Sequence, residues 1–178
     1  AGRVYAKGKM PQLSQTASHP DYAKVSKYQF RNITTQAFEG PFVANWANEM
    51  NFKTFAIISI QNDWGISVAE NFAAAVKANG GKVTSIEYFN PGMRDYRSIL
   101  TKISRDKPEV IYAGMMYEEG AILMQQAKQL GIQSTIFATS SVYSPKTLEL
   151  AGDAANGLYL STTFMPTSPE PHVQNFVK

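Results

Sequence analysis

Polar and aromatic side chains follow directly after three apolar runs of the chain. These corners are residues 61–64 (QNDW), residues 115–118 (MMYE) and residues 139–141 (TSS). Asp63 could meet a cationic ligand group, and Trp64 could wall a cleft for a small molecule because an aromatic ring brings large contact area and few rotors. The corners are therefore the first place to look for a binding site.

Each corner residue also has a structural interpretation. Asp63 could cap the helix that we expect to begin near Ile66, which is an ordinary role for Asp. Glu118 falls in the first turn of a predicted helix, where the helix dipole alone favours a carboxylate. Trp64 and Tyr117 could contact a ligand or could lie as lids over the edge of a sheet.

Hydroxyl side chains gather near the start of the chain as well. Ser14, Thr16 and Ser18 alternate, so on an extended backbone their hydroxyls would share one side. The ordinary interpretation of such a stretch is a solvated Ser/Thr loop, and the functional interpretation is a set of donors to a ligand.

Catalytic chemistry has few candidates here. The chain has no cysteine, so disulfides and thiol catalysis are excluded and a structural zinc site is not expected. His19 and His172 lie in the flanking segments, away from the corners, and no GxSxG, Walker or GxGxxG motif is present. We therefore predict no catalytic residue, no metal and no cofactor.

The composition is that of a folded domain. Of 178 residues, 44% are hydrophobic and 17% charged, and the net charge of +3 is too small to indicate nucleic-acid binding. No apolar run approaches the roughly 20 residues that span a bilayer. The first ten residues lack the apolar region of a signal peptide, which decides nothing because a mature or truncated secreted chain would lack it too.

Strands and helices that must position the corners alternate along the chain. We expect strands at residues 54–60, 82–89, 109–114, 135–138 and 157–162, with shorter ones within 10–18 and at 28–32. We expect helices at residues 36–50, 66–79, 95–106, 145–151 and from the second corner to residue 130. Helices of about a dozen residues between short strands require parallel strands with right-handed crossovers. The pattern predicts a doubly wound, three-layer α/β fold.

Apolar stripes at helical spacing predict the core. Phe42, Trp46, Phe72 and Leu100 lie in such stripes. Pro41 would begin the regular part of its helix. Residues 1–9 are predicted to be a loose end, and the tail is predicted to begin as a connector and to finish as a short helix.

Taken in order, the segments resemble type I periplasmic solute-binding proteins of ABC importers, and within them the branched-chain amino acid (leucine/isoleucine/valine) binding family. The matching segments are LSQTASHPDY, YQFRN, TFAIISIQNDWG, NPGMRDYRSIL, KPEVIYAGMMYEEGAILMQQAKQLGI and AGDAANGLYLS. No one segment is specific alone, but six of them in order cover nearly the whole chain from Met10.

The resemblance implies two α/β lobes around a cleft, of which this chain holds mainly the second. Residues 31–165 would be that second lobe, and residues 1–30 a loose end with a strand and loop of the first. Residues 166–178 would be a connector and helix leading back to the first lobe. A complete member is about twice this length, so the chain resembles a fragment with an exposed apolar seam that could self-associate.

The resemblance also implies a set of ligand contacts. Thr16 and Ser18 look like part of the hydroxyl set that fixes the ligand's carboxylate, and Trp64 corresponds to the aromatic residue at the first corner. A second family aromatic falls at Met115, which is not aromatic, although Tyr117 is near.

The position that carries an acid in the family falls at Ser140, which supplies no counter-charge for a ligand ammonium. Either Asp63 or Glu118 supplies it, or the ligand lacks an ammonium.

The function implied is that of an extracytoplasmic solute-binding component of an ABC importer. It would bind a small amino acid or carboxylate without chemistry and hand it to the importer's membrane subunits, in the periplasm or outside the cell. One alternative is a ligand-sensing domain of a receptor or transcription regulator with the same fold. Another is a flavodoxin-like enzyme, which would need a phosphate loop or a nucleophile at a corner.

Overall fold

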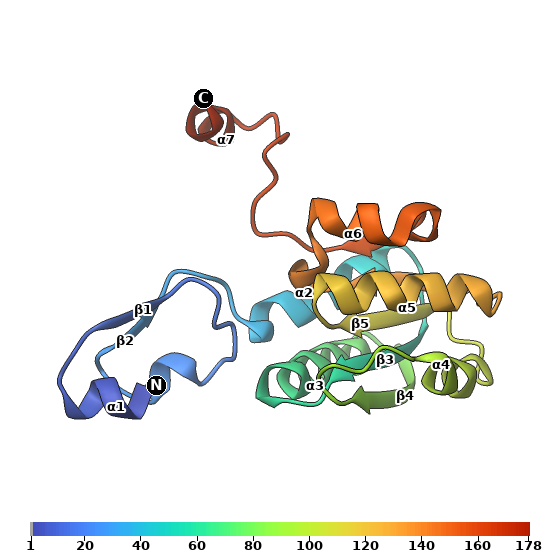
Figure 1. Ribbon diagram of the computed structural model, residues 1–178, viewed down its shortest axis with the longest axis horizontal. Helices are drawn as coiled ribbons and strands as arrows, with labels where there is room; N and C mark the ends of the chain where they lie inside the picture. The colour runs from blue at the N-terminus through green and yellow to red at the C-terminus, as the bar shows by residue number, and fades with distance from the viewer. Residues whose placement is uncertain (1) are drawn as a thin grey trace.

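The computed structural model describes residues 2–178, and a parallel five-stranded sheet forms its centre (Figure 1). The strands lie in the order β4-β3-β5-β6-β7, and every neighbouring pair is parallel. Their bounds are β3 Thr54–Ile60, β4 Lys82–Phe89, β5 Val110–Gly114, β6 Thr135–Ala138 and β7 Tyr159–Leu160. The last strand is shorter than the predicted 157–162, and the parallel topology is as predicted.

Helices cover both faces of this sheet, which gives the predicted three layers. They are α2 Gln36–Glu49, α3 Asp63–Ala78, α4 Arg97–Ser104, α5 Tyr117–Gln129 and α6 Pro145–Ala151. Alternate residues of β3 face opposite layers because side chains alternate along a strand. Phe55 and Ile57 pack with α2 and α3, whereas Ile58 and Ile60 pack with α4 and α5.

Helix α2 differs from the prediction in which side chains it buries. Its buried residues are the polar Gln36 and Glu39 and the smaller Gly40, Val43, Ala44 and Ala47. Gly40 lies so close to α3 that a Cβ there would meet the backbone N of Phe72 at 2.9 Å. The large Phe42 does not fit this tight contact and is 55% exposed, so its assignment to the core was wrong. Pro41 lies inside the helix, which begins five residues earlier, at Gln36, and does not start at Pro41.

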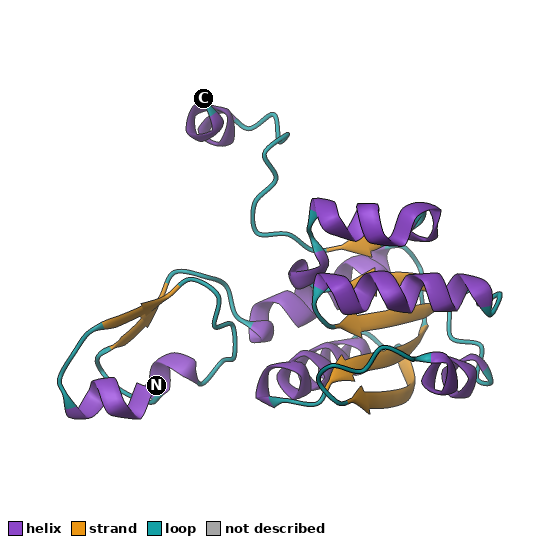
Figure 2. Cartoon of the chain, viewed as in Figure 1, coloured by secondary structure: helices purple, strands orange, loops and turns teal. Residues whose placement is uncertain are grey.

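The N-terminal segment lies apart from the five-stranded sheet (Figure 2). It holds α1 (Gly2–Lys7), β1 (Gln12–Ser14), a short 3-10 helix and β2 (Gln29–Arg31), with β1 and β2 paired in parallel. Residues 2–7 of the loose end predicted for residues 1–9 are therefore helical, and residues 8 and 9 form a turn. Leu13 and Phe30 are paired in register and both are more than half exposed.

The chain leaves the sheet after β7 through an extended stretch and ends in α7 (Pro171–Val177), as predicted for the tail. In Figure 1 the first helix, α1, and the last, α7, both lie to the left of the α/β body. None of the helices within residues 2–178 is long and apolar enough to cross a membrane.

Candidate functional site

The three predicted corners meet at one edge of the sheet. Register pairs Ser59 of β3 with Gly114 of β5, Ala113 with Ala138 of β6, and Ala138 with Leu160 of β7. The carboxyl ends of these parallel strands are therefore level, which is where open α/β sheets bind ligands. The segment that follows β7 adds Ser161 to the same edge.

Hydrogen bonds and a close backbone contact fix the first corner at the end of β3. The hydroxyl of the buried Ser59 lies 2.8 Å from the carbonyl O of Gly65 and 3.1 Å from that of Gly114. A Cβ at Gly65 would come within 2.0 Å of the carbonyl O of Ile60, so only glycine fits there. This close approach holds the first turn of α3 against the end of β3.

Asn62, and not Asp63, caps helix α3. The side-chain Oδ1 of Asn62 accepts the backbone N–H of Gly65 at 2.8 Å. Asp63 is the first residue of the helix and is exposed. The capping role considered for Asp63 was wrong by one position, because the helix begins earlier than its apolar stripe does.

Trp64 contacts the hydroxyl loop of the N-terminal segment. Its indole Nε1 donates to Ser18 Oγ at 3.1 Å, across 46 residues of sequence. Ser18 is 8% exposed and also accepts from Gln36 Nε2 at 3.3 Å. Two of the predicted site residues are thus brought together by a direct hydrogen bond.

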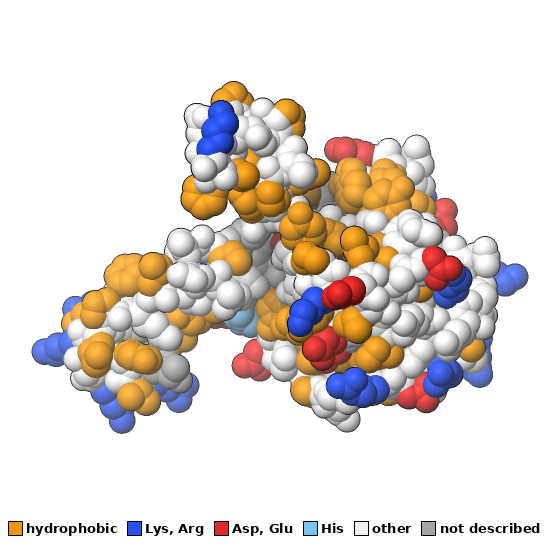
Figure 3. Space-filling view, turned by 45° about the horizontal axis from the view of Figure 1, so that its top comes forward, with side chains coloured by type: hydrophobic (Ala, Val, Ile, Leu, Met, Phe, Trp, Pro, Cys, Tyr) orange, Lys and Arg blue, Asp and Glu red, His pale blue; other side chains and the backbone are white. Residues whose placement is uncertain are grey.

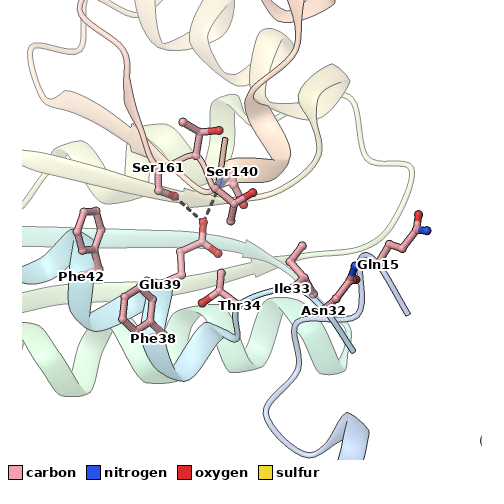
Figure 4. A pocket seen from close by; sticks show the side chains of 11 residues that line it. Gln15, Asn32, Ile33, Thr34, Phe38, Glu39, Phe42, Ser140 and Ser161 are labelled. Atoms are coloured by element: carbon pink, nitrogen blue, oxygen red, sulfur yellow. Dashed lines mark hydrogen bonds between the residues drawn. The ribbon is translucent and has the colours of Figure 1, made fainter. Parts of the chain in front are cut away.

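The same chain of hydrogen bonds continues to a buried carboxylate. Gln36 Nε2 donates to Glu39 Oε2 at 2.6 Å, and the backbone N–H of Ser140 donates to Glu39 Oε1 at 2.8 Å. The hydroxyl of Ser161 donates to the same Oε1 (Figure 4). Glu39 therefore joins α2 to the ends of β6 and β7, and we call the set Ser18, Gln36, Glu39, Trp64, Ser140 and Ser161 the strand-end network.

A cavity of about 680 Å³ borders this network on the side of Glu39. Among the predicted site residues only Ser140 lines it (Figure 4). The lining residues are Gln15, Asn32, Ile33, Thr34, Phe38, Glu39, Phe42, Ser140, Ser161, Thr162 and Thr163. Most of them come from the start of α2 and from the stretches that precede α2 and follow β7, while Gln15 follows β1 and Ser140 follows β6.

The other predicted site residues do not belong to the strand-end network. The side chain of Met115 is fully buried in the core beneath its corner, and Thr16 is exposed. The Tyr117 hydroxyl donates to Glu118 Oε1 at 3.1 Å, and this carboxylate raises the pKa of Tyr117. Both side chains lie at the start of α5, without a hydrogen bond to the strand-end network among residues 2–178.

Sequence reasoning missed Gln36 and Glu39, although a signal was present. Both lie on the same face of α2 as the buried Val43 and Ala47, because whole numbers of helical turns separate them along the helix. Polar residues on the buried face of a helix need partners, which marks them as members of a network.

Comparison with known proteins identifies the family. A sequence profile described as periplasmic binding protein matches residues 1–178. The chain belongs to the periplasmic binding protein family. This periplasmic binding protein chain is 26% identical over 148 residues to the leucine-, isoleucine-, valine-, threonine- and alanine-binding protein of Pseudomonas aeruginosa, covering 82% of the chain and 40% of that relative.

Solved structures agree with this assignment. A candidate branched-chain amino acid ABC transporter from Rhodospirillum rubrum is 40% identical, with a TM-score of 0.84 over 99% of this chain and 51% of that one. A solute-binding protein from Rhodopseudomonas palustris, solved with 3,4-dihydroxybenzoic acid, shares the fold at a TM-score of 0.87 and 20% identity, over 99% of this chain and 50% of that one. The periplasmic binding protein chain spans about half the length of the relatives that it matches.

Proposed function

We propose that the chain is the ligand-binding second lobe, with part of the first, of an extracytoplasmic solute-binding protein of an ABC importer. Membership of the periplasmic binding protein family supports a solute-binding role. The hydrogen bond from Trp64 to Ser18 is the observation that supports a ligand site at the strand ends. That bond sets a hydroxyl loop of the N-terminal segment against the strand ends of the α/β body. Two such surfaces facing each other form the walls of a ligand cleft.

In this proposal residues 31–165 form the second lobe, residues 1–30 belong to the first, and residues 166–178 lead back to it. The separate two-stranded sheet of β1 and β2 supports the first boundary, and the extended stretch after β7 supports the second. Exposed Leu13 and Phe30 would then pack against the remainder of the first lobe.

The proposed ligand is a small amino acid or carboxylate, which Ser18, Thr16, Trp64 and Ser140 would contact at the strand ends. Asp63, Tyr117 and Glu118 lie at neighbouring corners and would contact larger ligands. The protein would act by closing its lobes over the ligand, and the ligand would stabilise the closed state. It would then deliver the ligand to membrane subunits of an importer from the periplasm or the cell exterior.

A thermal-shift screen of the full-length protein tests this function. Amino acids and small aliphatic and aromatic carboxylates would be compared with sugars and nucleosides at equal concentration. A ligand at a hundred times its dissociation constant adds about 2.7 kcal/mol to the free energy of unfolding. A shift confined to amino acids or carboxylates supports the proposal, and a shift produced only by sugars or nucleosides would refute it.

A further inference from the structure

Glu39 is a carboxylate without a cationic partner in a buried position. It is 5% exposed, and none of the ion pairs within residues 2–178 includes it. Its three hydrogen-bond donors, from Gln36, Ser140 and Ser161, are all neutral. Its negative charge reaches the fully buried Tyr112, where it adds to the effect of burial in raising the pKa of the phenol.

Such a carboxylate has capacity for one more partner. Its two oxygens offer about four lone-pair sites, of which the neutral donors take three. A buried charge is costly unless an opposite charge or a full set of hydrogen bonds compensates it. The cavity supplies no such charge, since neither Lys, Arg nor His is among its lining residues.

Two aromatic rings stand beside Glu39 at the cavity. Phe38 and Phe42 lie one helical turn apart on α2, with ring centroids 6.2 Å apart and nearly parallel planes. They are 64% and 55% exposed, whereas the phenylalanines of the core, such as Phe72, are fully buried. Aromatic faces attract cations and apolar groups, so they complement a ligand that carries both.

We propose that this cavity binds the ammonium group of an amino acid or other small primary amine, with Glu39 as its counter-charge. The apolar part of the ligand lies against Phe38 and Phe42. Neutral polar side chains of Thr34, Thr162 and Thr163 line the rest of the cavity and suit a carboxylate. The volume of about 680 Å³ falls within the range of small-molecule sites, roughly 300–1,000 Å³.

This inference rests on the proposed class of function and narrows it, because it selects amine-bearing ligands over amine-free carboxylates. It also moves the ligand from Thr16, Ser18 and Trp64 into the neighbouring cavity, with Ser140 as the shared residue. Three probes of one carbon skeleton separate the two kinds of ligand: leucine, 4-methylpentanoate, which lacks the amine, and isopentylamine, which lacks the carboxylate. Binding of each to the full-length protein would be measured by calorimetry. We expect leucine to bind at least tenfold more tightly than 4-methylpentanoate.

The variant Glu39→Gln keeps the size of the side chain and removes its charge. We expect it to weaken leucine binding at least tenfold and to change 4-methylpentanoate binding less than twofold. Glu49→Gln removes an exposed charge from the same helix and serves as the matched control. An equal loss for both probes, or no loss for leucine, would show that Glu39 only holds the strand ends together and would overturn the inference.

If Glu39→Gln does not fold, Phe42→Ala replaces it, because this exposed ring can be truncated without opening the core. We expect a loss of at least threefold for leucine and isopentylamine. Tighter binding of 4-methylpentanoate than of leucine overturns the inference and leaves the proposed function intact. If isopentylamine binds but leucine and 4-methylpentanoate do not, the inference is supported and the proposed ligand class is refuted. If none of the three probes binds, the inference is overturned.

Discussion

Ser18 holds together groups that lie far apart in the sequence. Its Oγ accepts from the indole of Trp64 and from the side-chain amide of Gln36, and its carbonyl O accepts the backbone N–H of Gln36 at 2.9 Å. The residue is nearly buried, so water cannot readily replace these bonds.

Ser18→Ala should therefore destabilise the protein. The partly buried indole N–H of Trp64 loses its acceptor, and we expect the free energy of unfolding to fall by about 1–3 kcal/mol. Urea unfolding followed by tryptophan fluorescence measures this. Thr16→Ala is the control from the same loop, since its exposed hydroxyl should matter by less than about 0.5 kcal/mol. Equal effects of the two substitutions would contradict the role given to Ser18.

Individual site residues could be predicted only where a local pattern marked them. Trp64 and Ser140 follow directly after apolar strands, so their place at the strand ends was predictable. The bond between Trp64 and Ser18 was not, because it joins two segments whose approach depends on the whole fold. Glu39 was missed since its partners, Ser140 and Ser161, lie more than 100 residues away.

At the scale of elements, helix α3 owes its start to Asn62. Replacing this cap by alanine leaves the N–H of Gly65 without its acceptor and should cost about 1 kcal/mol of stability. Asp63→Ala should cost less than about 0.5 kcal/mol, because it only removes an exposed interaction with the helix dipole. Thermal unfolding of both variants distinguishes them, and a larger loss for Asp63→Ala than for Asn62→Ala would restore the original assignment of the cap.

The amino ends of β3 and β5 are joined by Glu109. Its Oε2 accepts the backbone N–H groups of Lys53 and Thr54 at 2.7 and 2.8 Å, and these bonds lower the pKa of the carboxyl group. A lowered pKa in the folded state means that ionised Glu109 stabilises the fold above its ordinary pKa. This contribution is lost as the pH falls through the lowered value.

Glu109→Gln should therefore reduce stability at neutral pH, by at most about 1 kcal/mol because the carboxylate is exposed to solvent. The difference from the unmodified protein should shrink as the pH falls below about 4. Urea unfolding at pH 7 and at acidic pH measures it, with Glu149→Gln as an exposed control on α6. A difference that does not depend on pH would contradict the assignment.

Element types were largely predictable because their apolar periods are clear. Strand β3 reads as a mostly apolar run without a charged residue and is buried along nearly its whole length. The burial of α2 was not predictable, since Gly40 and Ala44 allow a close contact with α3 and leave Phe42 outside. The sequence of a helix does not reveal how closely its neighbour approaches.

At the scale of the whole molecule, apolar side chains are exposed on the terminal segments (Figure 3). Leu13 and Phe30 share one face of the small sheet, and Phe164 contacts Phe176, which is 80% exposed. Such surface is costly in water and indicates an interface.

The 178-residue chain by itself should therefore associate as its concentration rises. Sedimentation velocity would show this, and the double substitution Leu13→Ser and Phe30→Ser should weaken the association by removing apolar area from the contact. Leu130→Ser, at an exposed side chain outside the terminal segments, is the control. A strictly monomeric chain at all concentrations would contradict the idea of an apolar seam.

The central position of β3 has a consequence for how the molecule opens. Strand β3 is paired on both sides, whereas β1 and β2 share only three residue pairs with each other. Amide hydrogens of β3 can exchange with solvent only when the α/β body unfolds, while those of the small sheet need only a local opening. Hydrogen exchange would then separate the chain into a slow body and a fast N-terminal segment, each with its own free energy of opening.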